Sequence, residues 1–390
     1  MSIVRPFPAA LLLGAAALLL SVTGCGRGTP ATDGPMVDNP FHGPHQSDGR
    51  YRLEVEELAR FGADEAPDEE VLTSASGVQF DDAGNIYFMD RTRLVSFGPD
   101  GSLRWETGRE GEGPGEFNRA FGVIMTAQGA LMISNQAGQR FDFYDLGGNL
   151  LSSVSRDALG LPGFPRPVAF LPDSTVLFNS SVPGMMGARV MRVDAANNWA
   201  MVDSFSVDLS DGGEVLAGMA LGGNVGFVND HVAIGHPSRY EFVLHTLEGD
   251  TVRVVRRDVA DFTRPGFATF GSGGMGARVY SILSLPVPLE GGFQLVRASW
   301  PTNIDDPNEH TRQSFAQENP PDPIIHHTFD VYDENWQLLF SVENEEAEAL
   351  DISSLGSAAV VAPGEFYITR SSPYPHVAHV RIRVIDTRGR

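Results

Sequence analysis

Six polar residues occupy corresponding positions in six similar stretches of the chain, each at the end of a short run rich in apolar residues. They are Asp90, Asn135, Ser180, His236, Arg297 and Arg370. If these stretches are equivalent strands of a ring-shaped repeat protein, their ends lie around one face, near the axis of the ring. The pattern therefore predicts a mixed polar ring that binds a ligand at the mouth of the axial channel.

The two arginines have the clearest chemistry of this set. Arg297 and Arg370 take neighbouring places in the predicted ring, and two planar guanidinium groups can fork onto one carboxylate or phosphate. A small anionic ligand is one expected partner. For Asp90, Asn135 and Ser180 a structural role is the alternative, because short polar side chains at strand ends often bond to nearby backbone groups.

The positions correspond because the chain repeats itself. Gly77 and Asp90 are matched 45 residues later by Gly122 and Asn135, and this period is typical of propeller blades. Each unit has runs of β-branched and aromatic residues broken by Asp-Gly or Gly-Gly turns, which indicates antiparallel strands. Four further units vary more, and they begin near Val168, Val225, Leu285 and Ala358.

Six units predict an all-β fold, a six-bladed β-propeller of four-stranded antiparallel blades over residues 51–390. The sixth unit ends near Asp386 without an outer strand. Tyr51–Arg60 alternates apolar and polar residues, so this N-terminal strand is expected to close the ring and remove its free edges. The Gly-rich stretch 266–276 and the insertion 300–327 are expected as loops bordering one face.

Part of the chain resembles a known repeat. Gly108–Phe117, with its Gly-Pro-Gly-Glu-Phe junction, and Arg140–Asp145 resemble the NHL repeat. The whole chain resembles the bacterial lipoproteins of the six-bladed β-propeller family. The resemblance is clear over residues 71–155 and schematic from 160 to 390. It implies the same fold as the repeat analysis.

A metal-dependent hydrolase or lactonase, with its site on the propeller axis, is the alternative function. Calcium-dependent lactonase propellers use one acidic and two amide ligands near the axis, and Asp90 and Asn135 resemble part of such a set. Arg297 and Arg370 in the same ring would oppose a Ca²⁺ ion. No G-x-S-x-G or H-E-x-x-H motif occurs. The sequence thus favours binding over catalysis, and Ca²⁺ is expected only under this alternative.

Cys25 is the only cysteine, which excludes an intrachain disulfide and a Cys-rich zinc site. It follows the apolar run Ala9–Leu20, which is too short to span a bilayer and fits an export signal over residues 1–24. The sequence Val22-Thr23-Gly24-Cys25 resembles a bacterial lipobox. That resemblance implies cleavage before Cys25 and attachment of diacylglycerol to its sulfur.

Residues 25–50 contain much Gly, Pro, Asp and His and little apolar material, which predicts a flexible tether. Gly26 stands where an Asp would favour retention at the inner membrane. The lipoprotein resemblance therefore implies a lipid-anchored protein of the bacterial cell envelope, at the outer membrane.

The excess of acidic residues limits the classes of partner that the protein is expected to bind. The 28 basic residues are all Arg, and 50 acidic residues give a net charge of −22. This acidity disfavours nucleic acid, and the lack of Lys excludes a P-loop lysine or a Schiff base. The expected function is a lipid-anchored, extracytoplasmic binding module for a protein, a glycan or a small anionic ligand. The oligomeric state does not follow from the sequence.

Overall fold

The structure is a computed structural model of the 390-residue chain. It describes residues 28–30, 35–63, 71–136, 138–161, 164–181, 187–209, 224–270 and 274–389. The predicted signal peptide and Cys25 lie outside the described residues. No helix in the described part of the chain has the length and apolar character needed to cross a bilayer.

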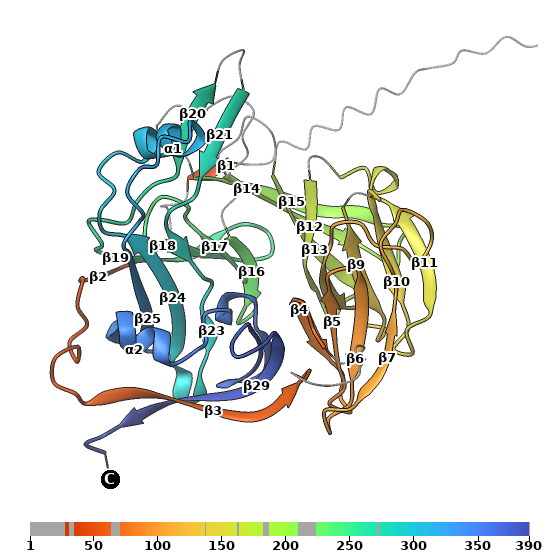
Figure 1. Cartoon of the computed structure of the whole chain (residues 1–390), viewed down its shortest axis with the longest axis horizontal. Helices are drawn as coiled ribbons and strands as arrows, with labels where there is room; N and C mark the ends of the chain where they lie inside the picture. Colours follow the sequence, from red (N-terminus) through yellow and green to blue (C-terminus); the bar gives the residue numbers. More distant parts are fainter. Residues whose placement is uncertain are drawn as a thin grey trace, which may run out of the picture.

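Six antiparallel sheets, the blades, are arranged in a ring (Figure 1). Blade 1 consists of β4 (Ala75–Phe80), β5 (Ile86–Asp90), β6 (Arg93–Phe97) and β7 (Leu103–Thr107). Blade 2 consists of β8 (Ala120–Met125), β9 (Leu131–Asn135), β10 (Arg140–Tyr144) and β11 (Leu150–Ser155). Blade 3 consists of β12 (Phe164–Phe170), β13 (Thr175–Ser181), β14 (Gly187–Asp194) and β15 (Ala200–Asp208).

The second half of the ring follows the same order. Blade 4 consists of β16 (Asn224–Val228), β17 (His231–Gly235), β18 (Glu241–His245) and β19 (Thr251–Arg257). In blade 5 two short strands pair with β24 on one side, so this blade consists of β22 (Ile282–Leu283), β23 (Val287–Pro288), β24 (Gln294–Pro301), β25 (Ile325–Tyr332) and β26 (Leu338–Glu343). Blade 6 consists of β27 (Ala359–Ala362), β28 (Glu365–Arg370), β29 (His376–Asp386) and β3 (Tyr51–Phe61).

The predicted six-bladed propeller is confirmed, and its core lies between the blades. Each of six apolar clusters joins two neighbouring blades around the ring. Strands β5 and β9 are buried along their whole length, because the middle of a blade is covered on both faces. Phe88 of β5 is fully buried, and burying such a side chain contributes about 1.5–3 kcal/mol.

The N-terminal strand closes the ring, as the sequence predicts. Strand β3 pairs antiparallel with β29 from Tyr51, opposite Asp386, to Phe61, opposite Val377. Blade 6 is therefore built from both ends of the propeller domain, visible as the orange and dark blue strands in Figure 1. This pairing joins the last blade to the chain that enters the first.

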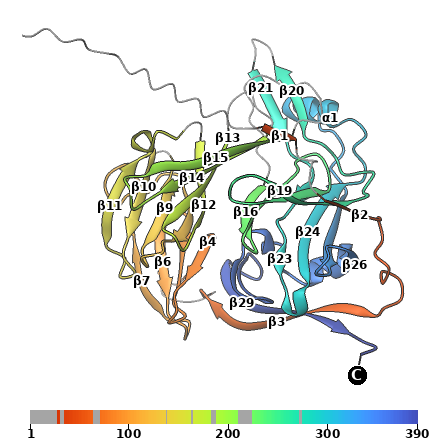
Figure 2. The same ribbon diagram turned by 180° about the vertical axis from the view of Figure 1, so that it is seen from behind.

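Residues 36–50 form a segment that we call the strap, because it follows the outside of blades 4 and 5 into β3 (Figure 2). Its first part, β2 (Met36–Asn39), pairs parallel with β19. Further along, the amide of Gln46 donates to the carbonyl of Ser341 at 2.9 Å and accepts from its N–H at 2.6 Å. For residues 36–50 this differs from the flexible tether predicted over residues 25–50, because β2 and the Gln46 amide bond to blades 4 and 5. Residues 25–27 and 31–34 lie outside the described residues.

The region expected as loops at one face has structure of its own. Residues 266–270 and 274–278 form a hairpin, β20 (Gly266–Phe270) and β21 (Gly274–Arg278), and the insertion contains α1 (Pro307–Phe315), which packs on that hairpin. Asp306 caps α1 by accepting from two backbone N–H groups, and Pro307 begins its first turn. The remaining short helices are α2 (Asn344–Ala349) and three 3-10 turns at Asp157–Leu159, Glu290–Gly292 and Leu355–Ser357.

Candidate functional site

The six predicted ligand residues lie on or beside the second strands of the blades. Asp90, Asn135 and Arg370 end β5, β9 and β28, Ser180 is the penultimate residue of β13, and His236 follows β17. Arg297 lies within its strand instead, because β24 is longer than its counterparts. The six positions are equivalent in the repeat, but most of these side chains form hydrogen bonds or ion pairs with neighbouring groups of the protein.

Asp90 and Asn135 have the same structural task in consecutive blades. The Asp90 carboxylate accepts from the backbone N–H groups of Thr73 and Ser74 at 3.0 and 2.7 Å, in the connection that enters blade 1. The Asn135 side chain accepts from the N–H of Asn118 at 3.2 Å, in the connection that enters blade 2. Both side chains are almost fully buried. Each one fastens the loop in front of its blade.

Three more of the six are buried or paired within the protein. Ser180 is buried in β13, between neighbouring strands. The His236 ring accepts from the N–H of Ser238 at 3.0 Å through Nδ1. Arg370 lies between two carboxylates, since its Nε is 3.1 Å from Asp351 Oδ2 and its Nη1 donates to Glu57. Internal carboxylates thus occupy the guanidinium of Arg370.

Arg297 differs from the other five. It is half-buried, and its guanidinium has no hydrogen-bond or ion-pair partner among the described residues. Its backbone is held firmly, because it exchanges bonds of 2.8 Å with Ser284 in the connection between β22 and β23. Burial lowers the pKa of the guanidinium, and no carboxylate offsets this effect. An arginine in this position is available to an external anion.

The Arg297 side chain borders a cavity of about 190 Å³, which we call the Arg297 pocket. Strand β25 and the segment formed by α2 and residues 350–353 provide the other walls, so the pocket lies where blade 5 meets the approach to blade 6. Its other lining residues are His327, Thr328, Phe329, Ala347, Glu348, Asp351, Ile352 and Ser353. The size suits a ligand of a few heavy atoms.

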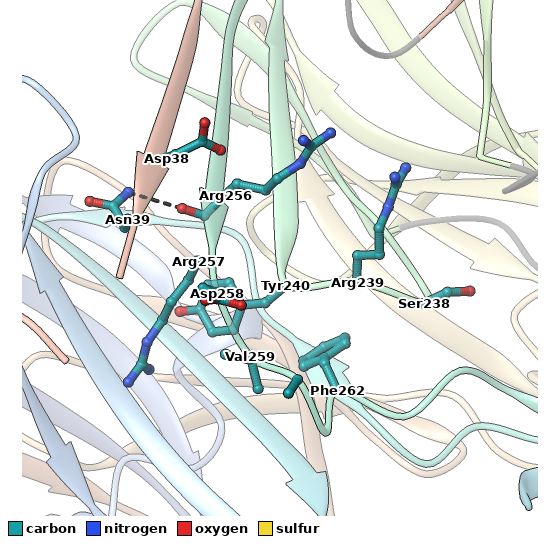
Figure 3. A pocket seen from close by; sticks show the side chains of 11 residues that line it. Asp38, Asn39, Ser238, Arg239, Tyr240, Arg256, Arg257, Asp258, Val259 and Phe262 are labelled. Carbon is teal, nitrogen blue, oxygen red and sulfur yellow. Dashed lines mark hydrogen bonds between the residues drawn. The ribbon is translucent and has the colours of Figure 1, made fainter. Parts of the chain in front are cut away.

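A larger cavity of about 520 Å³, the strap pocket, lies beside β2 at the end of blade 4 (Figure 3). Three arginines line it, but each has a carboxylate partner. Arg239 and Arg256 share the buried carboxylate of Glu241, and Arg257 points away from them in the view. The strap pocket therefore lacks the uncompensated cation that distinguishes the Arg297 pocket.

Arg257 belongs to a buried network that joins blades 4 and 5 and the strap. It binds Asp330 with two contacts of 2.7 and 2.6 Å, and both side chains are fully buried. The hydroxyl of Tyr240 donates to the same carboxylate, and Arg257 Nε donates to the carbonyl of Phe41 in the strap at 3.0 Å. Burial and the Asp330 charge raise the pKa of Tyr240 well above its usual value.

A third cavity, of about 640 Å³, lies between residues 260–264 and 301–308 and contains three aspartates. One of them, Asp306, is engaged as the cap of α1. Within the ranges that the structure describes, no three His, Cys, Asp or Glu side chains form a group suited to a metal ion. Asp90, which resembled a calcium ligand in the sequence, is bonded to Arg93 as well as to the backbone.

The ring of six blades and its closing strand define a six-bladed β-propeller. A candidate exported protein from Bacteroides fragilis NCTC 9343 matches 89% of this chain and 99% of its own, with a TM-score of 0.55 and 11% identity. A member of the DUF4221 family from Bacteroides vulgatus matches 87% of this chain and 99% of its own, with a TM-score of 0.56 and 10% identity. At these identities the similarity establishes the fold.

Sequence comparisons do not assign the chain to a family. No protein-family model matches the chain, and no curated protein matches it. The chain is thus placed by its architecture, and its function has to be argued from its side chains.

Two groups of residues in these sites were not singled out from the sequence. Glu348 and Asp351 of the Arg297 pocket stand in and after an acidic run that resembles an ordinary solvated surface. Asp330 offered a clearer signal, because it interrupts the apolar stretch Thr328–Tyr332 at a position expected to be buried. A lone carboxylate at such a position indicates a buried partner.

Proposed function

We propose that this protein is an extracytoplasmic β-propeller, anchored to a membrane through lipid on Cys25, that binds a small anionic ligand in the Arg297 pocket. The fold suits a binding role, since propellers present pockets at blade junctions on a rigid ring. Because one fold carries many functions, the proposal depends on the site and not on the architecture.

The supporting observation is that the guanidinium of Arg297 has no hydrogen-bond or ion-pair partner in the part of the chain that the structure describes. Removing a charged side chain from water without a partner costs free energy, and the protein contains 50 acidic residues that could have supplied one. Arg370, at the equivalent place in the next blade, has two carboxylate partners. A bound carboxylate or similar anion would give Arg297 the charge-assisted hydrogen bonds that Asp351 and Glu57 give Arg370.

The location rests on the sequence of the N-terminal region. The lipobox-like Val22-Thr23-Gly24-Cys25 supports export and lipid attachment, and Gly26 supports the outer membrane of a bacterial envelope. The description of the Bacteroides fragilis propeller as a candidate exported protein agrees with this location.

Thermal unfolding in increasing concentrations of acetate and sulfate tests the site. A ligand that binds only the folded state at about 100 times its Kd stabilises it by about 2.7 kcal/mol, so the unfolding temperature should rise in the unaltered protein. The rise should be absent in Arg297→Gln. Arg52→Gln is the matched control, because Arg52 is 64% exposed on β3. Equal shifts in all three proteins would show that the anions act elsewhere.

A further inference from the structure

The Arg297 pocket has a negative side as well as a positive one. Glu348 belongs to α2 and its side chain is 67% exposed, and Asp351 follows shortly after that helix. The nearest basic group to Glu348 is His327, with Nε2 at 3.7 Å from Oε1. Asp351 is held by Arg370 at 3.1 Å. Two carboxylates therefore line the same small cavity as the unpaired arginine.

The positive and negative groups do not neutralise each other. Arg297 forms no ion pair with Glu348 or Asp351. The pKa of Arg297 is lowered by burial, with no opposing contribution from either carboxylate. The cavity is thus lined by one cation and two carboxylates that form no ion pair with it, and a ligand that carried only one charge would pair with only one kind of group.

Three further lining residues of the Arg297 pocket are apolar. Phe329, Ala347 and Ile352 are buried and belong to the apolar cluster between blades 5 and 6. A short aliphatic chain would bury its surface there, at about 25 cal/mol per Å². The cavity of about 190 Å³ leaves room for such a chain and one polar group at each end.

From this arrangement we infer that the Arg297 pocket takes a small zwitterion, a carboxylate and a primary ammonium group joined by a short aliphatic spacer. The inference rests on the proposed function, since Arg297 holds the carboxylate. Glu348 and Asp351 receive the ammonium group, with Glu348 the less engaged of the two. A zwitterion has no net charge, so the protein charge of −22 does not repel it as it repels a simple anion.

Dissociation constants from ligand-observed NMR can test this with three probes of similar length: 4-aminobutyrate, butyrate and butylamine. Glycine and β-alanine extend the series to shorter spacers. A charge-assisted hydrogen bond contributes about 1.5–3 kcal/mol, so the best amino acid should bind at least about tenfold more tightly than butyrate. Butylamine should bind more weakly than that amino acid by a similar factor.

The variants separate the two ends of the ligand. Glu348→Gln should remove most of the preference for the amino acid over butyrate, while butyrate binding stays or improves. Glu346→Gln is the matched control, because Glu346 is exposed on the same helix and does not line the pocket. Arg297→Gln should weaken both carboxylate-bearing probes. Since Glu348 is exposed, its replacement is expected to leave the unfolding temperature unchanged.

Each adverse result has a distinct meaning. Equal affinities for butyrate and 4-aminobutyrate, both lost in Arg297→Gln, would overturn the zwitterion and leave the anion site. Binding of no carboxylate probe to the unaltered protein would overturn both. A preference for the amino acid that persists undiminished in Glu348→Gln and also in Asp351→Asn would show that the ammonium group is not recognised by these carboxylates.

Discussion

Arg297 and Arg370 occupy equivalent strands in neighbouring blades but have opposite electrostatic surroundings. Arg370 is enclosed by Glu57 and Asp351, while Arg297 borders a cavity and has no ion-pair partner within the described ranges. The difference arises because blade 6 alone contains the closing strand β3, which brings Glu57 to Arg370. Equivalent positions in the repeat therefore place side chains on equivalent strands, but they do not determine the partners of those side chains.

At the same scale, His245 should make stability depend on pH. It ends β18 and is fully buried beside Phe205 of blade 3. Burial lowers its pKa from the usual 6.5 to about 4. The folded protein favours the neutral ring, so its contribution is complete above pH 6.5 and is lost as the pH falls toward 4. Between pH 7 and 4.5 this residue should cost about 2–3 kcal/mol of unfolding free energy.

Urea unfolding of the unaltered protein and of His245→Phe at both pH values measures this contribution. The variant cannot titrate at this position, so its loss of stability on acidification should be smaller by the stated amount. Carboxylates that titrate in the same range affect both proteins alike and cancel in the comparison. The same loss in both proteins would mean that His245 is not held neutral by burial.

The strap is the element that ties the first part of the described chain to two blades. Asn39, which is 3% exposed, donates to the carbonyls of Arg256 and Trp336 at 3.1 Å each and accepts from the N–H of Leu338 at 2.7 Å. One side chain thus bridges β19 of blade 4 and the β25–β26 turn of blade 5. Gly43 allows close approach, since a Cβ there would lie 2.5 Å from the carbonyl oxygen of Leu339.

Replacing Asn39 by Ala should destabilise the protein by about 2–5 kcal/mol, because buried backbone groups lose their partners. Asp38→Ala is the control: Asp38 is exposed on the same strand, and its loss should change stability by less than about 0.5 kcal/mol. Chemical denaturation of both variants measures the difference. Similar stabilities for the two variants would indicate that the strap contributes little to the fold.

The strands were predictable and the strap was not, for a physical reason. The Gly77–Asp90 unit and its match at Gly122–Asn135 reveal the repeat, its turns and its apolar runs, and these features depend on residues close together in the sequence. Residues 36–50 have little apolar content, and their hydrogen bonds go to partners such as Ser341, 295 positions away from Gln46. Glu57, one of the two partners of Arg370, is likewise distant in the sequence. The repeat therefore located the Arg297 position without revealing that Arg297, unlike Arg370, has no carboxylate partner among the described residues.

On the scale of the whole molecule, β3 closes the ring by pairing with β29, so blade 6 contains strands from both ends of the propeller. The described chain begins at β1 (Gly28–Pro30), which runs parallel to β15 of blade 3. Cys25 stands three positions earlier in the sequence. Anchoring at Cys25 would hold the propeller within a short chain length of the membrane, since a residue spans at most about 3.6 Å.

Metabolic labelling of bacteria that express the protein, with an alkyne fatty acid, tests the anchor. The unaltered protein should take up the label and remain with the membrane fraction. Cys25→Ser should take up none, because the chain has no other cysteine. A labelled Cys25→Ser protein, or an unlabelled parent, would contradict lipid attachment at this residue.

The most direct test of the central claim is a calorimetric titration of the purified propeller with short carboxylates, including 4-aminobutyrate and butyrate. We predict saturable binding of one ligand per chain, weakened at least about tenfold by Arg297→Gln through loss of the charged hydrogen bonds and unchanged by Arg52→Gln. Equal affinity in Arg297→Gln and the unaltered protein, or no heat of binding in the unaltered protein, would contradict the assignment of the Arg297 pocket as the ligand site.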